Sequence, residues 1–278
     1  MSLFYLIGDL PDKRWAEIFL RMWHNHRASF RNVDPRKAET NSSFNPMEKP
    51  QLDHIVIRLP DAETPEELVQ YAEPFKKWFT LSSGGYHTGG KSQNVLISLP
   101  DGVYLELIAF TSTPPKDHRW AQRRPMNILD FAFLGHPERG KEEYGDGVPG
   151  GRGKCKWVVT VPKDEWTAGM LPFWCEDITP REIRVPKPET HPSGVTAVSR
   201  ITVLVETSRE KANLVAKYKE IIGGEDMTIG SPSGKDVTVD IRVAETKEEK
   251  EALQKEGHGI YKVEFNVPGI TLCNPLFC

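Results

Sequence analysis

The sequence predicts an α+β protein in which two βαβββ modules pair, and their strands form a curved mixed or antiparallel sheet around a cavity. The main observation is that a strand, a helix and a further group of strands follow one another in the same order in both halves of the chain. A second observation is that several strands alternate apolar and polar residues, so each sheet has one polar face. Two such units can pair to enclose a cavity. A helical pattern ahead of the first unit predicts an N-terminal helical extension.

The first unit is read from three signals. Residues 52–59 (LDHIVIRL) form an apolar run rich in β-branched residues, which predicts a strand. The sequence TPEE at 64–67 is a capping box with proline at the first helical position, so a helix is expected to begin there. Residues 94–99 and 103–110 are two further apolar runs joined by a Pro-Asp-Gly turn, which predicts a β-hairpin.

The second unit repeats this order. Residues 198–205 (VSRITVLV) predict a strand, and TSRE at 207–210 is another capping box. Residues 237–243 alternate apolar and polar side chains, and residues 260–267 predict the last strand. A helix that opens at Thr246 takes the place of the tight turn between these two strands.

The segment between the two units contains three further candidate strands, at residues 128–134, 156–161 and 172–175. Loops rich in glycine and proline connect them. A structureless loop of such length would be unusual inside one domain. We therefore expect these strands to join the sheet.

Residues 12–30 are expected to form an amphipathic helix, because the apolar residues between Trp15 and Trp23 fall on one helical face. This face would pack on the main body or on a second copy in a homodimer, and binding to a membrane surface is the alternative. The expected organisation is an N-terminal helix and linker at 1–50, then one domain at 51–278 made of a first module (51–110), middle strands (111–195) and a second module (196–278).

Composition excludes several classes of protein. The 278 residues include 36 lysines and arginines against 39 aspartates and glutamates, and this net charge of −3 gives no reason to expect a nucleic-acid partner. The four cysteines form no C-x-x-C pair, so a structural zinc site is not expected and free thiols in a reducing compartment are. The first residues resemble neither a signal peptide nor a membrane span. We therefore expect a cytoplasmic protein.

Two residues in the first unit suggest chemistry. His54 lies in the first expected strand and Glu106 in the last, and alternation places both on a polar sheet face. A buried histidine and carboxylate are costly unless they are paired or bind a metal. Their donor atoms suit a divalent ion such as zinc, iron, manganese, nickel or magnesium. A metal site that includes both residues and a simple His–Glu pair are the two alternatives.

Several short motifs occur in one order: LDHIVIRLPD, GGYHTGGKSQNVLISLPDGVYLELIAF, GGR at 150–152, LPFWCEDITPR, and HPSGV at 191–195. Together they resemble the glyoxalase-like domain family of the vicinal oxygen chelate superfamily. The resemblance covers residues 51–205, and the second unit only by its pattern. It implies paired modules and a divalent metal ion held by His54 and Glu106. Isomerases, dioxygenases, lyases and non-catalytic binding proteins all belong to this superfamily.

The chain departs from the family's pattern in the second unit, where Arg200 stands at the position that could offer a histidine. His87 or His191 could complete the metal site instead, or the site could hold no metal. His87 follows two glycines, which allow a close approach of the backbone to a ligand. The expected catalytic residues are His54, His87 and Glu106, and the expected substrate-binding residues are Asn94, Arg152, His191 and Arg200.

The resemblance implies an enzyme of small-molecule metabolism that acts on an oxygenated organic substrate by acid–base chemistry, with or without help from a metal. Two alternatives remain open at this point. One is a non-catalytic protein that binds or sequesters a small molecule in the same cavity. The other is a metal-free isomerase or cyclase.

Overall fold

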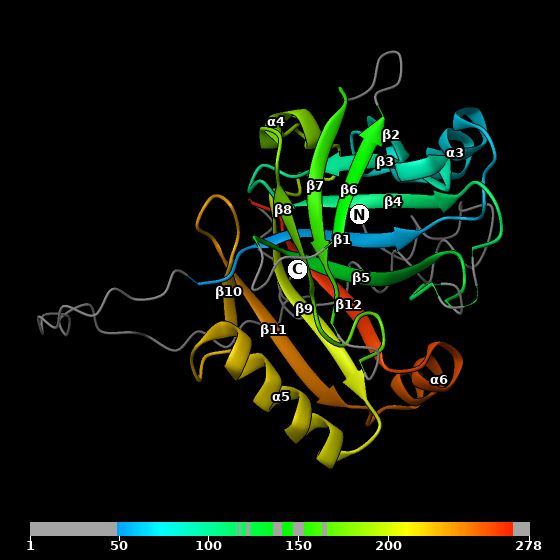
Figure 1. Ribbon diagram of the computed structural model, residues 1–278. Coiled ribbons are helices and arrows are strands. Elements are labelled where there is room, and N and C mark those ends of the chain that lie inside the picture. The colour runs from blue at the N-terminus through cyan, green and yellow to red at the C-terminus, as the bar shows by residue number, and fades with distance from the viewer. Residues whose placement is uncertain are drawn as a thin grey trace, which may run out of the picture.

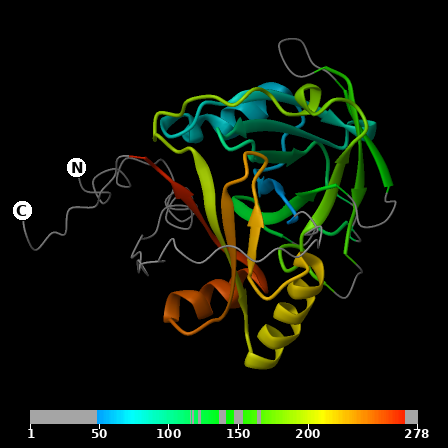
Figure 2. The same cartoon turned by 90° about the vertical axis from the view of Figure 1, so that its left-hand side faces the viewer.

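The computed structural model describes residues 49–268, except residues 115, 117, 121–122, 136–140, 147–152 and 163–165. The expected N-terminal helix at 12–30 and nearly all of the linker lie outside the described residues. Figure 1 shows a closed barrel in its upper part and a separate sheet with two helices in its lower part, and Figure 2 shows the same arrangement from the side. The α+β class and the curved sheet around a cavity are confirmed.

The barrel strands follow the order β1-β4-β3-β2-β6-β7-β8-β5. Their bounds are β1 (Leu52–Arg58), β2 (Ser82–His87), β3 (Ser92–Ser98), β4 (Tyr104–Phe110), β5 (Asn127–Leu134), β6 (Lys141–Asp146), β7 (Cys155–Thr160) and β8 (Phe173–Asp177). The two halves of the barrel have the same internal order, because β1 runs parallel to β4 and β5 runs parallel to β8. Antiparallel pairing of β1 with β5 and of β2 with β6 joins the halves.

The partner of the first unit is therefore the middle segment, and the expectation that the second unit would help to enclose the cavity is wrong. That unit forms its own sheet, in the order β10-β11-β9-β12. Its elements are β9 (Ala197–Val205), α5 (Ser208–Ile222), β10 (Thr228–Gly230), β11 (Asp236–Val243), α6 (Lys247–Glu256) and β12 (Gly259–Asn266). By strand pattern alone, the middle segment and the second unit could each pair with the first unit. Burial of the outer wall of the barrel against the second sheet favours the arrangement found.

That outer wall is strongly apolar. Ile55 and Ile57 of β1 point away from the cavity and are completely or almost completely buried. They belong to one continuous core with Ile201 and Val203 of β9. The second sheet thus covers the outer face of β1 and removes apolar area from water.

The helices begin where their capping boxes predict. Thr64 caps α3 (Pro65–Ala72), and the same reciprocal pair of bonds opens α5 at Thr207 and α6 at Thr246. The other helical elements among the described residues are two 3-10 turns (Glu73–Lys77 and Thr88–Gly90) and a single-turn helix, α4 (Arg181–Arg184). Among the described helices, none combines the length and the apolar character needed to span a bilayer.

The β3–β4 hairpin is confirmed, with Ser98 paired to Tyr104 across its turn. Asp101 in this turn also connects the two sheets, because its carboxylate accepts hydrogen bonds from the backbone N–H groups of Val103 and Val198. The sequence did not predict β2, β6, β10 or α4. The first two are rich in glycine, serine or charge (SSGGYH and KEEYGD), and the other two are very short.

Candidate active site

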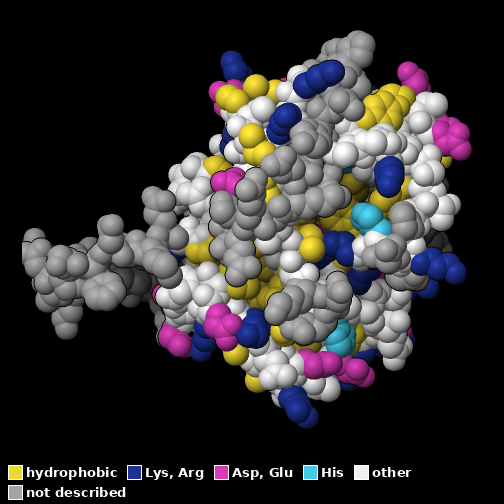
Figure 3. All heavy atoms as spheres, in the orientation of Figure 1, with side chains coloured by type: hydrophobic (Ala, Val, Ile, Leu, Met, Phe, Trp, Pro, Cys, Tyr) yellow, Lys and Arg dark blue, Asp and Glu magenta, His cyan; other side chains and the backbone are white. Residues whose placement is uncertain are grey.

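A cavity of about 310 Å³ lies inside the barrel. It takes its lining from both halves of the barrel, from the segment between β4 and β5, and from α4. The lining residues are His54, His87, Ser92, Tyr104, Glu106, Ile108, His118, Arg119, Trp120, Trp157, Val159, Val161, Phe173, Cys175 and Arg184. On the face of the molecule in Figure 3, lysine and arginine side chains are scattered and form no single basic patch.

His54 is oriented by its neighbour in the sequence. Alternation would place Asp53 on the opposite face of β1, but the pairing of β1 with β5 shifts register between Leu52 and His54. Asp53 Oδ2 lies 2.7 Å from His54 Nδ1. Because Nδ1 is bound to this carboxylate, Nε2 is the ring nitrogen that faces the cavity, 3.6 Å from Glu106 Oε2.

Asp53 is fully buried and ionised. Burial raises the pKa of a carboxyl group, but the guanidinium groups of Arg184 and Arg181 outweigh this effect and hold the pKa of Asp53 well below its usual range. Arg184 Nη1 lies 3.0 Å from Asp53 Oδ2, and Arg181 also contacts this carboxylate. The negative charge next to His54 is therefore permanent at neutral pH.

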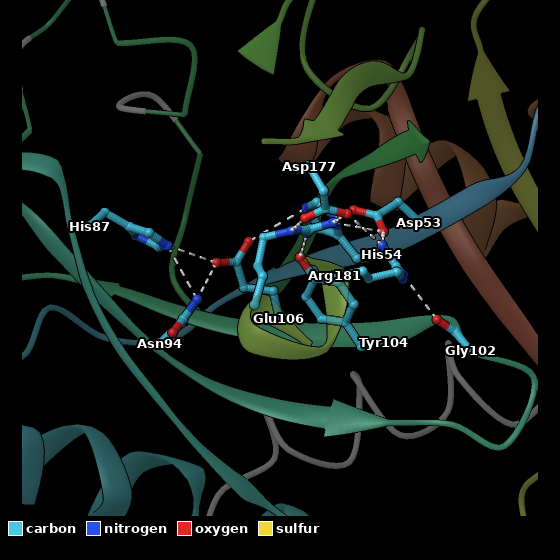
Figure 4. A network of polar contacts seen from close by, with 10 residues as sticks. Asp53, His54, His87, Asn94, Gly102, Tyr104, Glu106, Asp177 and Arg181 are labelled. Atoms are coloured by element: carbon cyan, nitrogen blue, oxygen red, sulfur yellow. Dashed lines mark hydrogen bonds and ion pairs between the residues drawn. The ribbon is translucent and has the colours of Figure 1, made fainter. Parts of the chain in front are cut away.

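Glu106 is the centre of the polar network in Figure 4, where it lies between the pair His87–Asn94 and the group that includes Asp53 and His54. Its Oε1 accepts a hydrogen bond of 2.6 Å from Asn94 Nδ2 and lies 3.3 Å from His87 Nε2. Burial raises the pKa of Glu106, but the adjacent His87, His54 and Asn94 have the larger, opposite effect, and the pKa falls to about 2. Glu106 is therefore a buried carboxylate anion.

A close backbone approach fixes Asn94. The N–H of Gly85 donates to Asn94 Oδ1 at 3.0 Å, which turns the amide nitrogen toward Glu106. A Cβ atom on Gly84 would lie 2.0 Å from the same Oδ1, so only glycine fits there. The glycines before His87 were expected to permit close approach to a ligand, and one of them permits close approach to Asn94.

His87 ends β2 and reaches the cavity. Its Nδ1 lies 2.8 Å from Ser92 Oγ, and its ring packs edge-on against Trp157 at a centroid distance of 5.8 Å. The four residues His54, His87, Asn94 and Glu106, which the sequence suggested as site residues, are thus brought together.

Arg184 is a site residue that the sequence analysis missed. It is only 2% exposed, and α4 places it at the base of the cavity. It donates to the Tyr104 hydroxyl at 2.7 Å and to Asp177 Oδ2 at 2.8 Å, besides its contact with Asp53. Tyr104 in turn stacks on the His54 ring at 4.7 Å. The only sequence signal was the run of charge in EDITPREIR after an apolar strand.

Arg119 is the second site residue that was missed. Its Nη2 lies 2.7 Å from Asp130 Oδ2, and its guanidinium lies 5.8 Å from the centre of the Phe173 ring. Arg58 holds this segment in place, because its Nη1 donates to the backbone carbonyls of Trp120 and Arg123. No periodic pattern marks such a loop residue in the sequence.

Two expected substrate-binding residues lie elsewhere. His191 does not line the cavity; its Nδ1 accepts a hydrogen bond from the N–H of Thr80, and its ring packs against Phe79. Arg200 lies on β9 in the second sheet, where its Nε is 3.0 Å from Glu264 Oε2. Its side chain is 42% exposed and does not line the cavity in the barrel. Arg152 lies outside the described residues.

The residues of the cavity do not fit a metal centre. His54 and Glu106 approach closely enough to share an ion, but Glu106 Oε1 is already bonded to the Asn94 amide. The facing half of the barrel offers Phe173 and Cys175, and burial raises the pKa of the Cys175 thiol, which keeps it protonated. Within the described part of the chain, no group of three or more histidine, cysteine or acidic side chains could hold an ion.

Comparison with known proteins gives one family match. The sequence profile of a family described as a glyoxalase-like domain matches residues 52–221. No curated protein sequence matches the chain.

Similar solved structures include a hypothetical protein from Staphylococcus aureus, at 14% identity over 71% of this chain and 87% of that one, with a TM-score of 0.47. They also include a mutant of 4-hydroxymandelate synthase from Streptomyces coelicolor. It is 11% identical over 78% of this chain and 71% of that one, with a TM-score of 0.47. A third is a xylose isomerase-like TIM barrel/4-hydroxyphenylpyruvate dioxygenase fusion protein. It is 11% identical over 80% of this chain and 37% of that one, with a TM-score of 0.46.

Proposed function

This chain belongs to the glyoxalase-like domain family, and from that premise we propose that it is an enzyme that moves a proton on a small oxygenated organic molecule held in the barrel. The observation that carries the proposal is the pair of proton acceptors His54 Nε2 and Glu106 Oε2, which face each other at 3.6 Å at the wall of a largely apolar cavity. A substrate held at this wall would lie within reach of both groups, so a proton can pass between it and the imidazole.

His54 is the proposed base. Asp53 holds the Nδ1 proton, so the Nε2 lone pair is directed at the cavity. A carbon acid next to a carbonyl, or a hydroxyl group, would give its proton to Nε2. The imidazolium that forms would lie between the carboxylates of Asp53 and Glu106, and both would stabilise it.

Tyr104 is the proposed donor to the oxygen on which negative charge develops. Burial raises the pKa of Tyr104 well above its usual value, so the phenol keeps its proton. Its oxygen already accepts a hydrogen bond from Arg184, which leaves the phenol proton to be donated. A preorganised donor of this kind in a buried site contributes strongly to stabilisation of an oxyanion.

The test is exchange of a carbon-bound proton with solvent deuterium. Panels of α-hydroxy ketones and 2-oxo acids are incubated with the full chain in D₂O, and loss of the α-proton signal is followed by NMR. We expect at least one panel member to exchange, and His54→Asn to slow its exchange by about 100-fold or more. A matched variant, His258→Asn, changes a half-buried histidine that contacts Glu210 near the second sheet and should leave exchange unchanged.

The contradicting results are equally clear. Equal exchange rates in wild type and His54→Asn would remove His54 as the base. A panel member that binds tightly and never exchanges would favour a binding protein with the same cavity.

A further inference from the structure

The cavity is lined by groups of opposite charge that differ in exposure. Glu106 is an anion whose side chain is 8% exposed. Arg119 lines the cavity at a more exposed position, with a side chain that is 20% exposed. A ligand with one anionic group would be repelled by the first residue and attracted by the second.

Arg119 is the cation that would meet such a group. Its Nη2 pairs with Asp130 at 2.7 Å, and Nε and Nη2 are both buried, so the exposed part of this side chain lies on its other atoms. Asp130 is occupied by other donors, since it also accepts from Trp120 Nε1 and from the N–H groups of Gly169 and Phe131. A partly exposed guanidinium at the wall of a cavity is suited to bind a carboxylate.

Aromatic rings connect Arg119 to the proposed base. Phe173 contacts both, with the His54 ring 5.2 Å from its centroid and the Arg119 guanidinium 5.8 Å from it. Trp120 packs edge-on against the same ring at 6.2 Å, and Trp157 lines the cavity. Such walls favour flat, preferably aromatic ligands, because rings gain from edge-to-face and stacked contacts.

We propose that the cavity selects a flat, monoanionic carboxylic acid, with the carboxylate on Arg119, the ring or planar body against Phe173, and the far end of the molecule near His54 and Glu106. This deepens the proposed function and rests on it for the use of the cavity. It concerns binding, so it is tested without turnover. The position of Glu106 excludes the reverse orientation, in which two carboxylates would meet in a buried space.

The experiment compares phenylacetate with phenylacetamide, which share size and shape and differ in charge. Binding to the full chain is measured by calorimetry or by ligand-observed NMR. Phenylacetate should bind about tenfold more tightly than the amide, because a charge-assisted hydrogen bond is stronger than the neutral one that the amide forms. In Arg119→Gln this preference should fall to near one, whereas Arg209→Gln, on an exposed position of α5, should keep it.

A second measurement covers the case in which Arg119→Gln does not fold because Asp130 loses its partner. A crystal of the wild-type protein with 4-bromophenylacetate should place the bromine, by its anomalous signal, on the His54 side of Phe173 and the carboxylate at Arg119. The inference is overturned if wild type binds neither probe or both equally, if Arg119→Gln keeps the preference, or if the bromine lies beside Arg119. Normal carboxylate preference without any proton exchange would refute the proposed function alone.

Discussion

Replacement of Glu106 by glutamine tests the electrostatics of the site directly. Glu106 titrates at about 2 in the folded protein, against 4.5 for an ordinary glutamate. At 1.36 kcal/mol per pKa unit, this difference corresponds to about 3 kcal/mol of stability. Because the folded pKa is depressed, the contribution is fully present above pH 4.5 and is lost as the pH falls toward 2.

Glu106→Gln should therefore lower the free energy of unfolding by up to about 3 kcal/mol near neutral pH. The gap between wild type and variant should shrink by about 1.4 kcal/mol between pH 6 and pH 3.5, as the wild-type carboxylate begins to lose its advantage. Urea unfolding at several pH values, followed by tryptophan fluorescence, measures this gap. Other acidic groups titrate in both proteins and cancel in the comparison.

The matched control is Glu220→Gln. Glu220 is exposed on α5 and pairs with Lys217 at 2.9 Å, and an exposed pair of this kind contributes about 1 kcal/mol or less. A gap between wild type and Glu106→Gln that stays constant from pH 6 to pH 3.5 would refute the reasoning. It would mean that Glu106 is not held ionised by its imidazole and amide neighbours.

Three further predictions concern the position of the Asn94 amide, the buried charge of Asp53 and the metal content of the protein. Gly84→Ala should displace the Asn94 amide, because the new Cβ would lie 2.0 Å from Asn94 Oδ1. The variant should fold and exchange the substrate proton with deuterium more slowly than wild type. An exchange rate equal to that of wild type would contradict this prediction. Asp53→Asn should lower the free energy of unfolding by about 3–5 kcal/mol, measured by thermal or urea unfolding, because the buried guanidinium of Arg184 loses one of its anionic partners. A decrease below 1 kcal/mol would show that Asp177 alone can compensate the charge of Arg184. Elemental analysis of protein purified without chelator or nickel resin should find well under one transition-metal ion per chain, and a stoichiometric ion would show that ligands outside the described residues complete a site.

Local sequence signals predicted much of the fold because they act over a few residues. A threonine followed three residues later by glutamate satisfies backbone donors at a helix start, and this works the same way in α3, α5 and α6. Alternation along β1 and β4 placed His54 and Glu106 on one face, as found. The choice of which strands close the barrel depends on long-range burial, and the pattern carries no information about it.

The same reasoning explains which site residues were missed. Asp53 follows Leu52 in a strand, and alternation puts it on the wrong face unless the register shift is known. Arg184 and Arg119 come from a single-turn helix and a loop, where no period reveals direction. Arg200 had the residue type expected of an anion contact, but its strand belongs to the other sheet, where it pairs with Glu264.

The second sheet explains how the barrel can keep a polar interior. In β1, Ile55 and Ile57 face outward and are buried against the second sheet, while His54 lines the cavity and Val56 belongs to a separate cluster with Ile108 and Phe173. The large apolar cluster on the outer face of β1 contributes burial that does not depend on filling the cavity. The interior can instead hold two carboxylates, their cationic partners and an open cavity. Substitutions on the outer face of the barrel should therefore change mainly the stability of the protein, and substitutions that line the cavity should change mainly ligand binding and proton transfer. Asp53 and Glu106 are exceptions, because their charges contribute to both stability and the chemistry of the site.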